Sequence, residues 1–106
     1  MTLRIYETAV TVVREMGAIA REIAKEDPDL ARQMRRAVTS MLLNLAEGSD
    51  SQGRNQRAKF WLALGSARET KACVDAAIAL AYIADVDAAA MARLEHVTAV
   101  LVKLVR

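Results

Sequence analysis

The stretch QMRRAVTSMLLNLAEG, residues Gln33 to Gly48, predicts one amphipathic helix around which the rest of the chain can be arranged. Its large apolar residues recur at three- and four-residue spacing, which places them on one helical face. These residues are Met34, Val38, Met41, Leu42 and Leu45. Gly48 follows the last of them, at a position where helices commonly end in a left-handed conformation that glycine adopts without strain. The pattern therefore predicts a helix that ends at about Glu47.

Three further helices are predicted by the same periodicity, from about Leu3 to Lys25, Asn55 to Tyr82 and Ala88 to Val105. The helix described above begins at Pro28, because Asp27 is a good N-cap and proline suits the first helical position. Either Asp85 or Asp87 caps the last helix. Short connections favour antiparallel neighbours. The sequence therefore predicts an all-α, up-down-up-down antiparallel four-helix bundle that forms a single domain over residues 1–106.

Two features of the predicted helices bear on association with other chains. The first helix has two adjacent apolar seams, which either sit deep in the chain's own bundle or let one seam pack on another subunit. The second of these seams comprises Tyr6, Val10, Val13, Gly17, Ala20 and Ala24. The third helix has a run of small residues where another helix backbone can approach closely, which would explain a glycine inside a helix. This run contains Ala63, Gly65, Ser66 and Ala67.

Two motifs resemble the four helix bundle protein family. They are Q-x-R-R-A-x-x-S-x-x-x-N-x-A-E-G at residues 33–48 and the run Ala63-Leu64-Gly65-Ser66-Ala67-Arg68-Glu69. Some members of that family are encoded within intervening sequences of bacterial 23S rRNA genes. A more distant relative, the accessory protein of diversity-generating retroelements, is understood to bind RNA and a reverse transcriptase. The resemblance covers roughly residues 5–104 and implies a ring-like homo-oligomer, a pentamer.

Positive charge is concentrated in the middle of the chain, although the net charge is only +2. Residues 31–60 carry six basic and two acidic side chains, whereas residues 1–30 carry four basic and six acidic ones. Phosphate groups are bound by such side chains, and self-association would multiply them into a ring or stripe. The sequence has no recognised DNA- or RNA-binding motif. The candidate nucleic-acid contacts are Arg32, Arg35, Arg54, Arg57 and Lys59.

Polar residues within the two motifs form a second candidate group, a structural polar network. Arg36, Asn44 and Glu47 follow one line along the predicted helix, and Glu69 lies in the second motif. If the two helices are antiparallel, Glu69 falls near Arg36, and a buried ion pair between them would fix the helix register. The alternative is that Asn44, Glu47 and the following loop form a surface pocket or a partner site.

The sequence offers no constellation for catalysis or for binding a metal or cofactor. Bundles hold di-metal sites with Glu-x-x-His motifs, but the only histidine, His96, has no acidic residue three positions earlier. The single cysteine, Cys73, lies among alanine and valine residues and is interpreted as a small buried hydrophobe. Ser66 has no evident base, and residues 48–55 lack the spacing of a phosphate-binding loop. No enzyme activity, cofactor, metal or small-molecule substrate is therefore expected.

The function predicted from these observations is that of an interaction module. The chain shows neither a signal-peptide pattern nor the run of about 18 apolar residues that a membrane span needs, so a cytoplasmic protein is expected. The leading interpretation is a non-enzymatic homo-oligomer that binds nucleic acid, RNA or DNA, or a nucleoprotein partner such as a reverse transcriptase. The alternative is a purely structural homo-oligomeric assembly protein whose partner is another protein.

Overall fold

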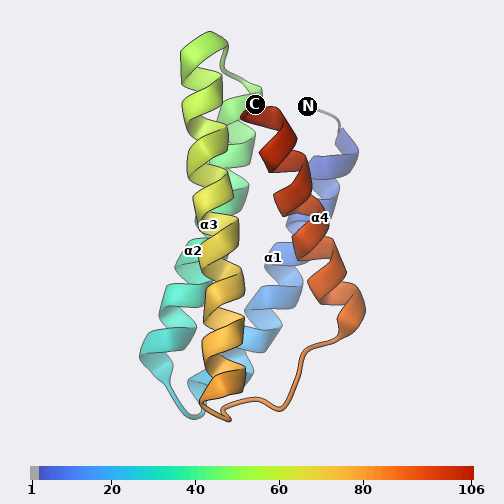
Figure 1. Ribbon diagram of the computed structural model, residues 1–106. Helices are drawn as coiled ribbons and strands as arrows, with labels where there is room; N and C mark the ends of the chain where they lie inside the picture. The colour runs from blue at the N-terminus through green and yellow to red at the C-terminus, as the bar shows by residue number, and fades with distance from the viewer. Residues whose placement is uncertain (1–2) are drawn as a thin grey trace.

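Four helices account for most of the chain in the computed structural model, which describes residues 3–106 (Figure 1). They are α1 (Leu3–Ala24), α2 (Pro28–Ser49), α3 (Gly53–Ala79) and α4 (Ala88–Leu104). The α2–α3 connection lies at the same end of the bundle as the start of α1 and the end of α4, and the other two connections lie at the opposite end. Successive helices are therefore antiparallel, and the predicted all-α, up-down-up-down bundle is confirmed.

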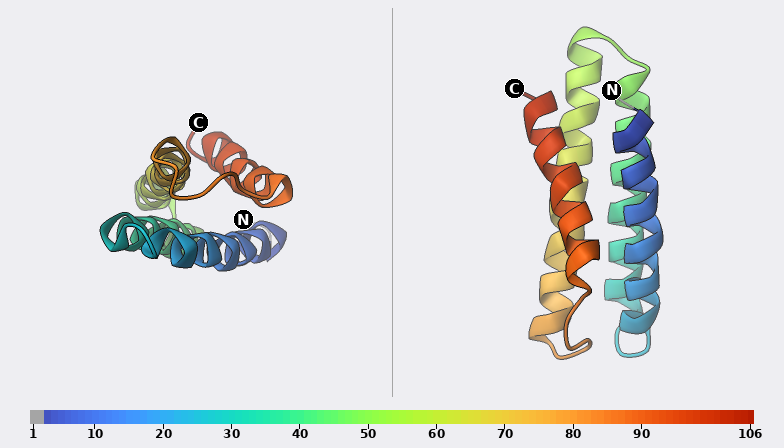
Figure 2. Two further views of the ribbon diagram at one scale, coloured as in Figure 1. Left: turned by 90° about the horizontal axis from the view of Figure 1, so that it is seen from below. Right: turned by 90° about the vertical axis from the view of Figure 1, so that its right-hand side faces the viewer.

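The helices form two layers, α1 beside α2 and α3 beside α4, in a body of 42 × 24 × 19 Å (Figure 2). α2 packs most extensively, against both α3 and α1, whereas α4 makes smaller contacts with α3 and α1. The diagonal pairs hardly touch, so each helix turns one face to the core and one to the outside. Within residues 3–106, no helix is long and apolar enough to cross a membrane.

The core is aliphatic, with Phe60 as the aromatic member among its buried side chains. The face of α2 predicted from the periodicity is confirmed, because four of its five apolar residues are buried and only Leu42 is half-buried. α1 and α4 face it with large side chains that are fully buried. These are Val12, Met16, Ile23, Leu94, Val97 and Leu101.

Both apolar seams of α1 are largely covered by the chain's own bundle. The first seam is buried except for Ile19, which is half-buried; it comprises Ile5, Ala9, Val12, Met16, Ile19 and Ile23. In the second seam Ala20 is buried, and Val13 and Ala24 are half-buried against the core. No residue of either seam is exposed, so packing within the chain accounts for most of this wide apolar face.

Aspartate side chains start two of the helices. Asp27 Oδ1 accepts a hydrogen bond from the backbone N–H of Leu30 at 3.0 Å, which confirms the predicted N-cap of α2. Asp87 Oδ2 accepts from the backbone N–H of Ala90 at 3.1 Å, so Asp87 rather than Asp85 caps α4. Each bond satisfies a first-turn N–H group that has no partner inside its helix.

The prediction that Gly48 ends α2 in a left-handed conformation is wrong. The helix continues to Ser49, and the glycine with positive φ is Gly53, at +59°, where α3 begins. Gly48 serves packing instead: a Cβ added there would lie 2.6 and 2.7 Å from two ring carbons of Phe60. The absence of a side chain therefore lets the Phe60 ring reach the α2 backbone. At the other end, Ala81 takes a φ of 62° and the α3 helix ends at Ala79, earlier than predicted.

The small-residue run of α3 divides between two faces. Ala63 and Ala67 are buried in the core, whereas Gly65 is exposed. A Cβ added to Gly65 would meet no atom within 4 Å, so no helix of the same chain approaches it closely. The predicted close approach therefore does not occur within the chain at Gly65, because this position points outward from the bundle.

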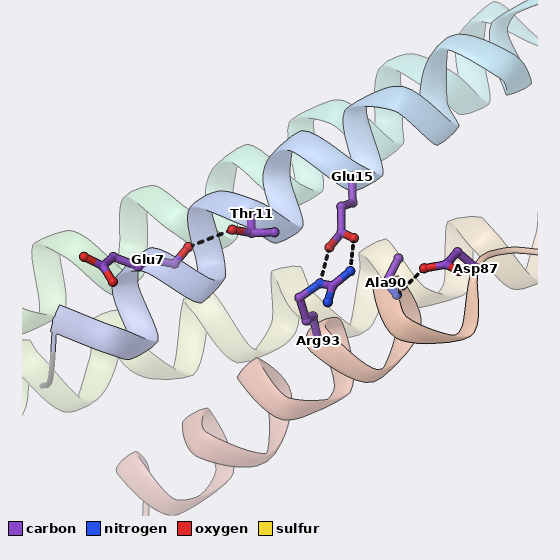
Figure 3. A network of polar contacts seen from close by, with 6 residues as sticks. All are labelled: Glu7, Thr11, Glu15, Asp87, Ala90 and Arg93. Atoms are coloured by element: carbon purple, nitrogen blue, oxygen red, sulfur yellow. Dashed lines mark hydrogen bonds and ion pairs between the residues drawn. The ribbon is translucent and has the colours of Figure 1, made fainter.

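An ion pair joins α1 to α4, the helix that is least extensively packed. Arg93 Nε donates to Glu15 Oε1 at 2.8 Å, and Arg93 Nη2 donates to Glu15 Oε2 (Figure 3). The hydrogen bonds with Glu15 raise the pKa of Arg93 above its ordinary value, and the nearby carboxylate charges of Glu15 and Asp87 add to the effect. This two-pronged arginine–carboxylate geometry holds the first half of α4 in a defined position over α1.

Candidate interaction surface

A chain of hydroxyl and amide groups crosses from α2 to α3 halfway along the bundle. Ser66 Oγ donates to Ser40 Oγ at 2.9 Å, and Asn44 Nδ2 donates to the same Ser40 oxygen at 3.0 Å. The hydroxyl of Thr70, which is completely buried, donates to the Ser66 backbone carbonyl at 2.8 Å. Asn44 therefore belongs to a polar network that links α2 to α3. The bond that crosses between the helices is the one from Ser66 to Ser40, and Thr70 bonds Ser66 within α3.

The predicted network members on either side of Asn44 have different surroundings. Glu47 forms an ion pair with Lys59 across α2 and α3, with 2.9 Å between Oε2 and Nζ. Arg36 and Glu69 line one hollow of about 390 Å³ between the same two helices, but both are exposed. No ion pair joins them in the part of the chain that the structure describes. The predicted buried Arg36–Glu69 pair is therefore wrong, because both side chains lie at the solvated rim of the interface.

The five basic residues predicted to contact nucleic acid are not gathered into one patch. Arg32 lies in the second turn of α2, and its Nη2 lies 2.6 Å from Oδ1 of Asp29 in an ion pair. Arg54 lies at the opposite end of the bundle. The helical rise separates these two levels by about 27 Å. Arg35 lies between them, beside an open groove along α2. Only Arg54, Arg57 and Lys59 share one end of the bundle.

That end gains positive charge from Lys103 and Arg106 at the end of the chain as well. Arg57 Nε donates to the backbone carbonyl of Val105 at 3.0 Å, which places the end of α4 beside the first turns of α3. We call residues 3–7, 47–60 and 101–106 the basic end, because they carry six basic and three acidic side chains. The opposite end, residues 20–32 and 71–90, carries four basic and seven acidic side chains. Charge is therefore separated along the bundle. Counting charges along the sequence does not show this, because Lys103 and Arg106 are far in sequence from the other basic residues of this end.

The outer face of α3 carries a regular seam that no other helix of residues 3–106 covers. Its members recur at spacings of 4-3-4-3-4, the period of helix–helix packing. We call this the α3 seam, and it comprises Ala58, Leu62, Gly65, Glu69, Ala72 and Ala76. All are exposed except Ala76, which is half-buried. The small residues of this seam are evident in the sequence, but its outward orientation is not.

Two large apolar side chains lie on this outer surface. Leu62 of the α3 seam and Leu43 of α2 are each 56% exposed. The Ser40–Ser66 and Glu47–Lys59 contacts bracket both leucines, so they lie at the same level of the bundle. Beside Leu43, an open groove of about 480 Å³ runs along α2. The outer face of α2 and α3 thus combines exposed leucines, small residues and two opposite charges, Arg36 and Glu69, that make no ion pair within residues 3–106.

The nucleophilic and metal-binding side chains do not form a site in the described residues. Cys73 is buried, and burial raises the pKa of its thiol, with the Glu69 carboxylate raising it further. The Ser66 hydroxyl donates to another hydroxyl, and His96 is exposed on α4. Over residues 3–106, no group of three or more histidine, cysteine or acidic side chains is placed to hold a metal ion.

Comparison with known proteins gives this fold a family. The model of the 23S rRNA-intervening sequence protein family matches residues 1–103. A search of curated proteins found no match to this chain. A similar solved structure is the 1.70 Å crystal structure of a protein of unknown function from the S23 ribosomal protein family of Bacteroides thetaiotaomicron VPI-5482. It has a TM-score of 0.82 and 17% sequence identity, over 96% of this chain and 98% of that chain, a likeness that shows the fold alone. With its family match over nearly the whole chain, this protein belongs to the 23S rRNA-intervening sequence protein family.

Proposed function

We propose that this protein is a non-enzymatic, self-associating interaction module whose copies meet at the outer face of α2 and α3. The observation that carries the proposal is the exposed α3 seam, together with Leu43 and Leu62 at one level of the bundle. Side chains repeating at 4-3 spacing match the way one helix packs against another. Gly65 and the alanines of the seam allow a second backbone to come close, which gives a glycine in the middle of α3 a role in packing.

Charge on this face favours another copy as the partner. Arg36 and Glu69 line the same hollow, have opposite charges and make no ion pair within the described residues. In a ring this face of one copy meets a different face of the next. That second face carries both basic and acidic side chains, so Arg36 and Glu69 can each meet an opposite charge across the contact. The family resemblance implies a ring of five subunits, and we propose that number for the assembly.

The proposal predicts that negative charge on the two leucines separates the copies. Leu43→Glu combined with Leu62→Glu should convert the assembly to a chain of 11.6 kDa in sedimentation velocity, because association would bury two carboxylates without partners. Helical content by circular dichroism should stay at the wild-type level, since both leucines are exposed. The matched control is Ala92→Glu with Ala99→Glu, two exposed positions on α4 that should leave the assembly intact. A double leucine variant that sediments as the wild type would reject this interface.

Nucleic-acid binding is a second candidate function, favoured by the charge separation along the bundle. The basic end retains Arg54, Arg57 and Lys59 from the predicted contacts and adds Lys103 and Arg106. Arginine and lysine at one end attract phosphate backbones, while the acidic end repels them, so the chain would bind in one orientation. Self-association would repeat this end in every subunit and strengthen binding by multivalency. The distant resemblance to a protein that binds RNA and a reverse transcriptase supports this candidate.

A further inference from the structure

On its outer surface, α3 carries a line of arginines around Trp61. This line lies on the side of α3 that is nearer to α4. Arg54, Arg57, Trp61 and Arg68 follow one another at spacings of 3, 4 and 7 residues, which places them along one line of the helix. We call this line the Trp61 stripe. The hydrogen bond from Arg57 to the Val105 carbonyl shows that it runs on the α4 side of α3, whereas the α3 seam faces the α2 side. It extends over about 21 Å of helix.

Trp61 contributes little to the packing of the bundle. The residue is 52% exposed, whereas the adjacent Phe60 is only 3% exposed and packs in the core. The indole therefore presents an accessible aromatic surface on a rigid helix, which is the geometry on which unpaired bases stack.

The charge around Trp61 selects a polyanion over a second copy of the chain. The first sixteen residues of α3, from Gly53 to Arg68, carry no acidic side chain. Three of their four basic side chains belong to the stripe, and the fourth, Lys59, pairs with Glu47. Two such stripes facing each other would bring like charges together, which disfavours self-association at this face. Within residues 3–106, Arg57 bonds the Val105 carbonyl through Nε, which leaves its terminal guanidinium nitrogens as donors for a phosphate.

We propose that the Trp61 stripe binds single-stranded nucleic acid, with an unpaired base stacked on Trp61 and phosphates held by the arginines on either side. This inference rests on the nucleic-acid candidate described above and specifies its mode. A duplex keeps its bases stacked inside and offers only phosphates to the stripe, so it gains nothing from the indole. A stacking platform flanked by cations binds with little preference for sequence.

The chain reports on this site directly, because Trp61 is its only tryptophan. Titration with a 20-nucleotide oligouridylate, with excitation of the indole alone, should quench the Trp61 emission and saturate. Heparin, a polyanion without bases, should compete for the arginines without quenching. Trp61→Leu should weaken binding of a fluorescently labelled oligouridylate about 5- to 150-fold by anisotropy, the range for losing one stacked base. Trp61→Phe, which keeps an aromatic ring, should recover most of the affinity.

The outcomes separate this inference from the candidate function on which it rests. If the wild type fails to bind the labelled oligouridylate at low salt, both are wrong. If Trp61→Leu binds with wild-type affinity, or a 20-base-pair duplex quenches the emission equally, nucleic-acid binding stands and stacking on Trp61 is wrong. If the emission shifts on dilution of the protein but not with oligouridylate, Trp61 contacts another copy and the inference is wrong. Circular dichroism of the exposed-site variants checks that each retains its helices.

Discussion

Phe60→Ala should lower the free energy of unfolding by about 3–5 kcal/mol, the largest effect that we expect from a single substitution. Phe60 is buried in the core and its ring lies against the backbone of Gly48. Removing the ring loses the transfer free energy of a large apolar side chain and leaves a cavity that helices can only partly close. Urea denaturation at a fixed protein concentration measures the change, since concentration alters the apparent stability of a self-associating protein.

The neighbouring aromatic residue supplies the control for this prediction. Trp61→Ala removes a larger side chain from the next position, yet it should change the free energy of unfolding by less than about 1 kcal/mol. The indole is 52% exposed and therefore contributes little burial to the fold. Similar losses for the two variants would contradict the placement of Phe60 inside and Trp61 outside.

Gly48→Ala should be the second most damaging change, with a loss of about 1–3 kcal/mol. The added Cβ would lie 2.6 Å from a ring carbon of Phe60, which is closer than two carbon atoms can approach. The ring cannot simply swing away because it is held in the core, so α2 and α3 must move apart near their connection. Thermal and urea unfolding of the variant should show this loss even though alanine is the better helix former.

A double-mutant cycle identifies the cause of that loss. In a Phe60→Leu background, Gly48→Ala should cost much less, because the ring that the methyl group meets is absent. Gly17→Ala is the matched control: it replaces another mid-helix glycine, and an added Cβ there meets nothing within 4 Å. This control should be neutral or stabilising by about 0.5–1 kcal/mol. Equal losses at Gly48 in both backgrounds would show that Phe60 is not the obstacle.

Gly48 and Gly65 show how far the sequence predicts the fold. Periodicity and aspartate caps predicted four helices whose ends differ from the structure by at most three residues. Periodicity predicts which face of a helix is apolar, but it carries no information about which side chain on another helix lies opposite. For that reason Gly48 was predicted to end a helix when it makes room for Phe60, and the sequence did not show that Gly65 faces away from the other helices of its own chain.

The candidate site was harder to predict for the same reason. The Ser40–Ser66 hydrogen bond and the Glu47–Lys59 ion pair depend on the register of α2 against α3, which packing of the whole core decides. The charge run in residues 31–60 predicted a basic surface, but a helix some 33 Å long spreads that run over both ends of the bundle. The basic end depends on the contact between Arg57 and the last turn of α4, and the sequence alone does not show that contact.

The central claim, that copies of this chain associate through an uncovered outer face, is tested most directly by the mass of the wild-type particle. Light scattering after size-exclusion chromatography, repeated over a dilution series and at low and high salt, measures that mass. We predict a whole-number multiple of 11.6 kDa, fivefold for the ring implied by the family resemblance, that persists at high salt because leucines and small residues form the contact. A particle of 11.6 kDa at every concentration would contradict the claim and leave the α3 seam without a partner.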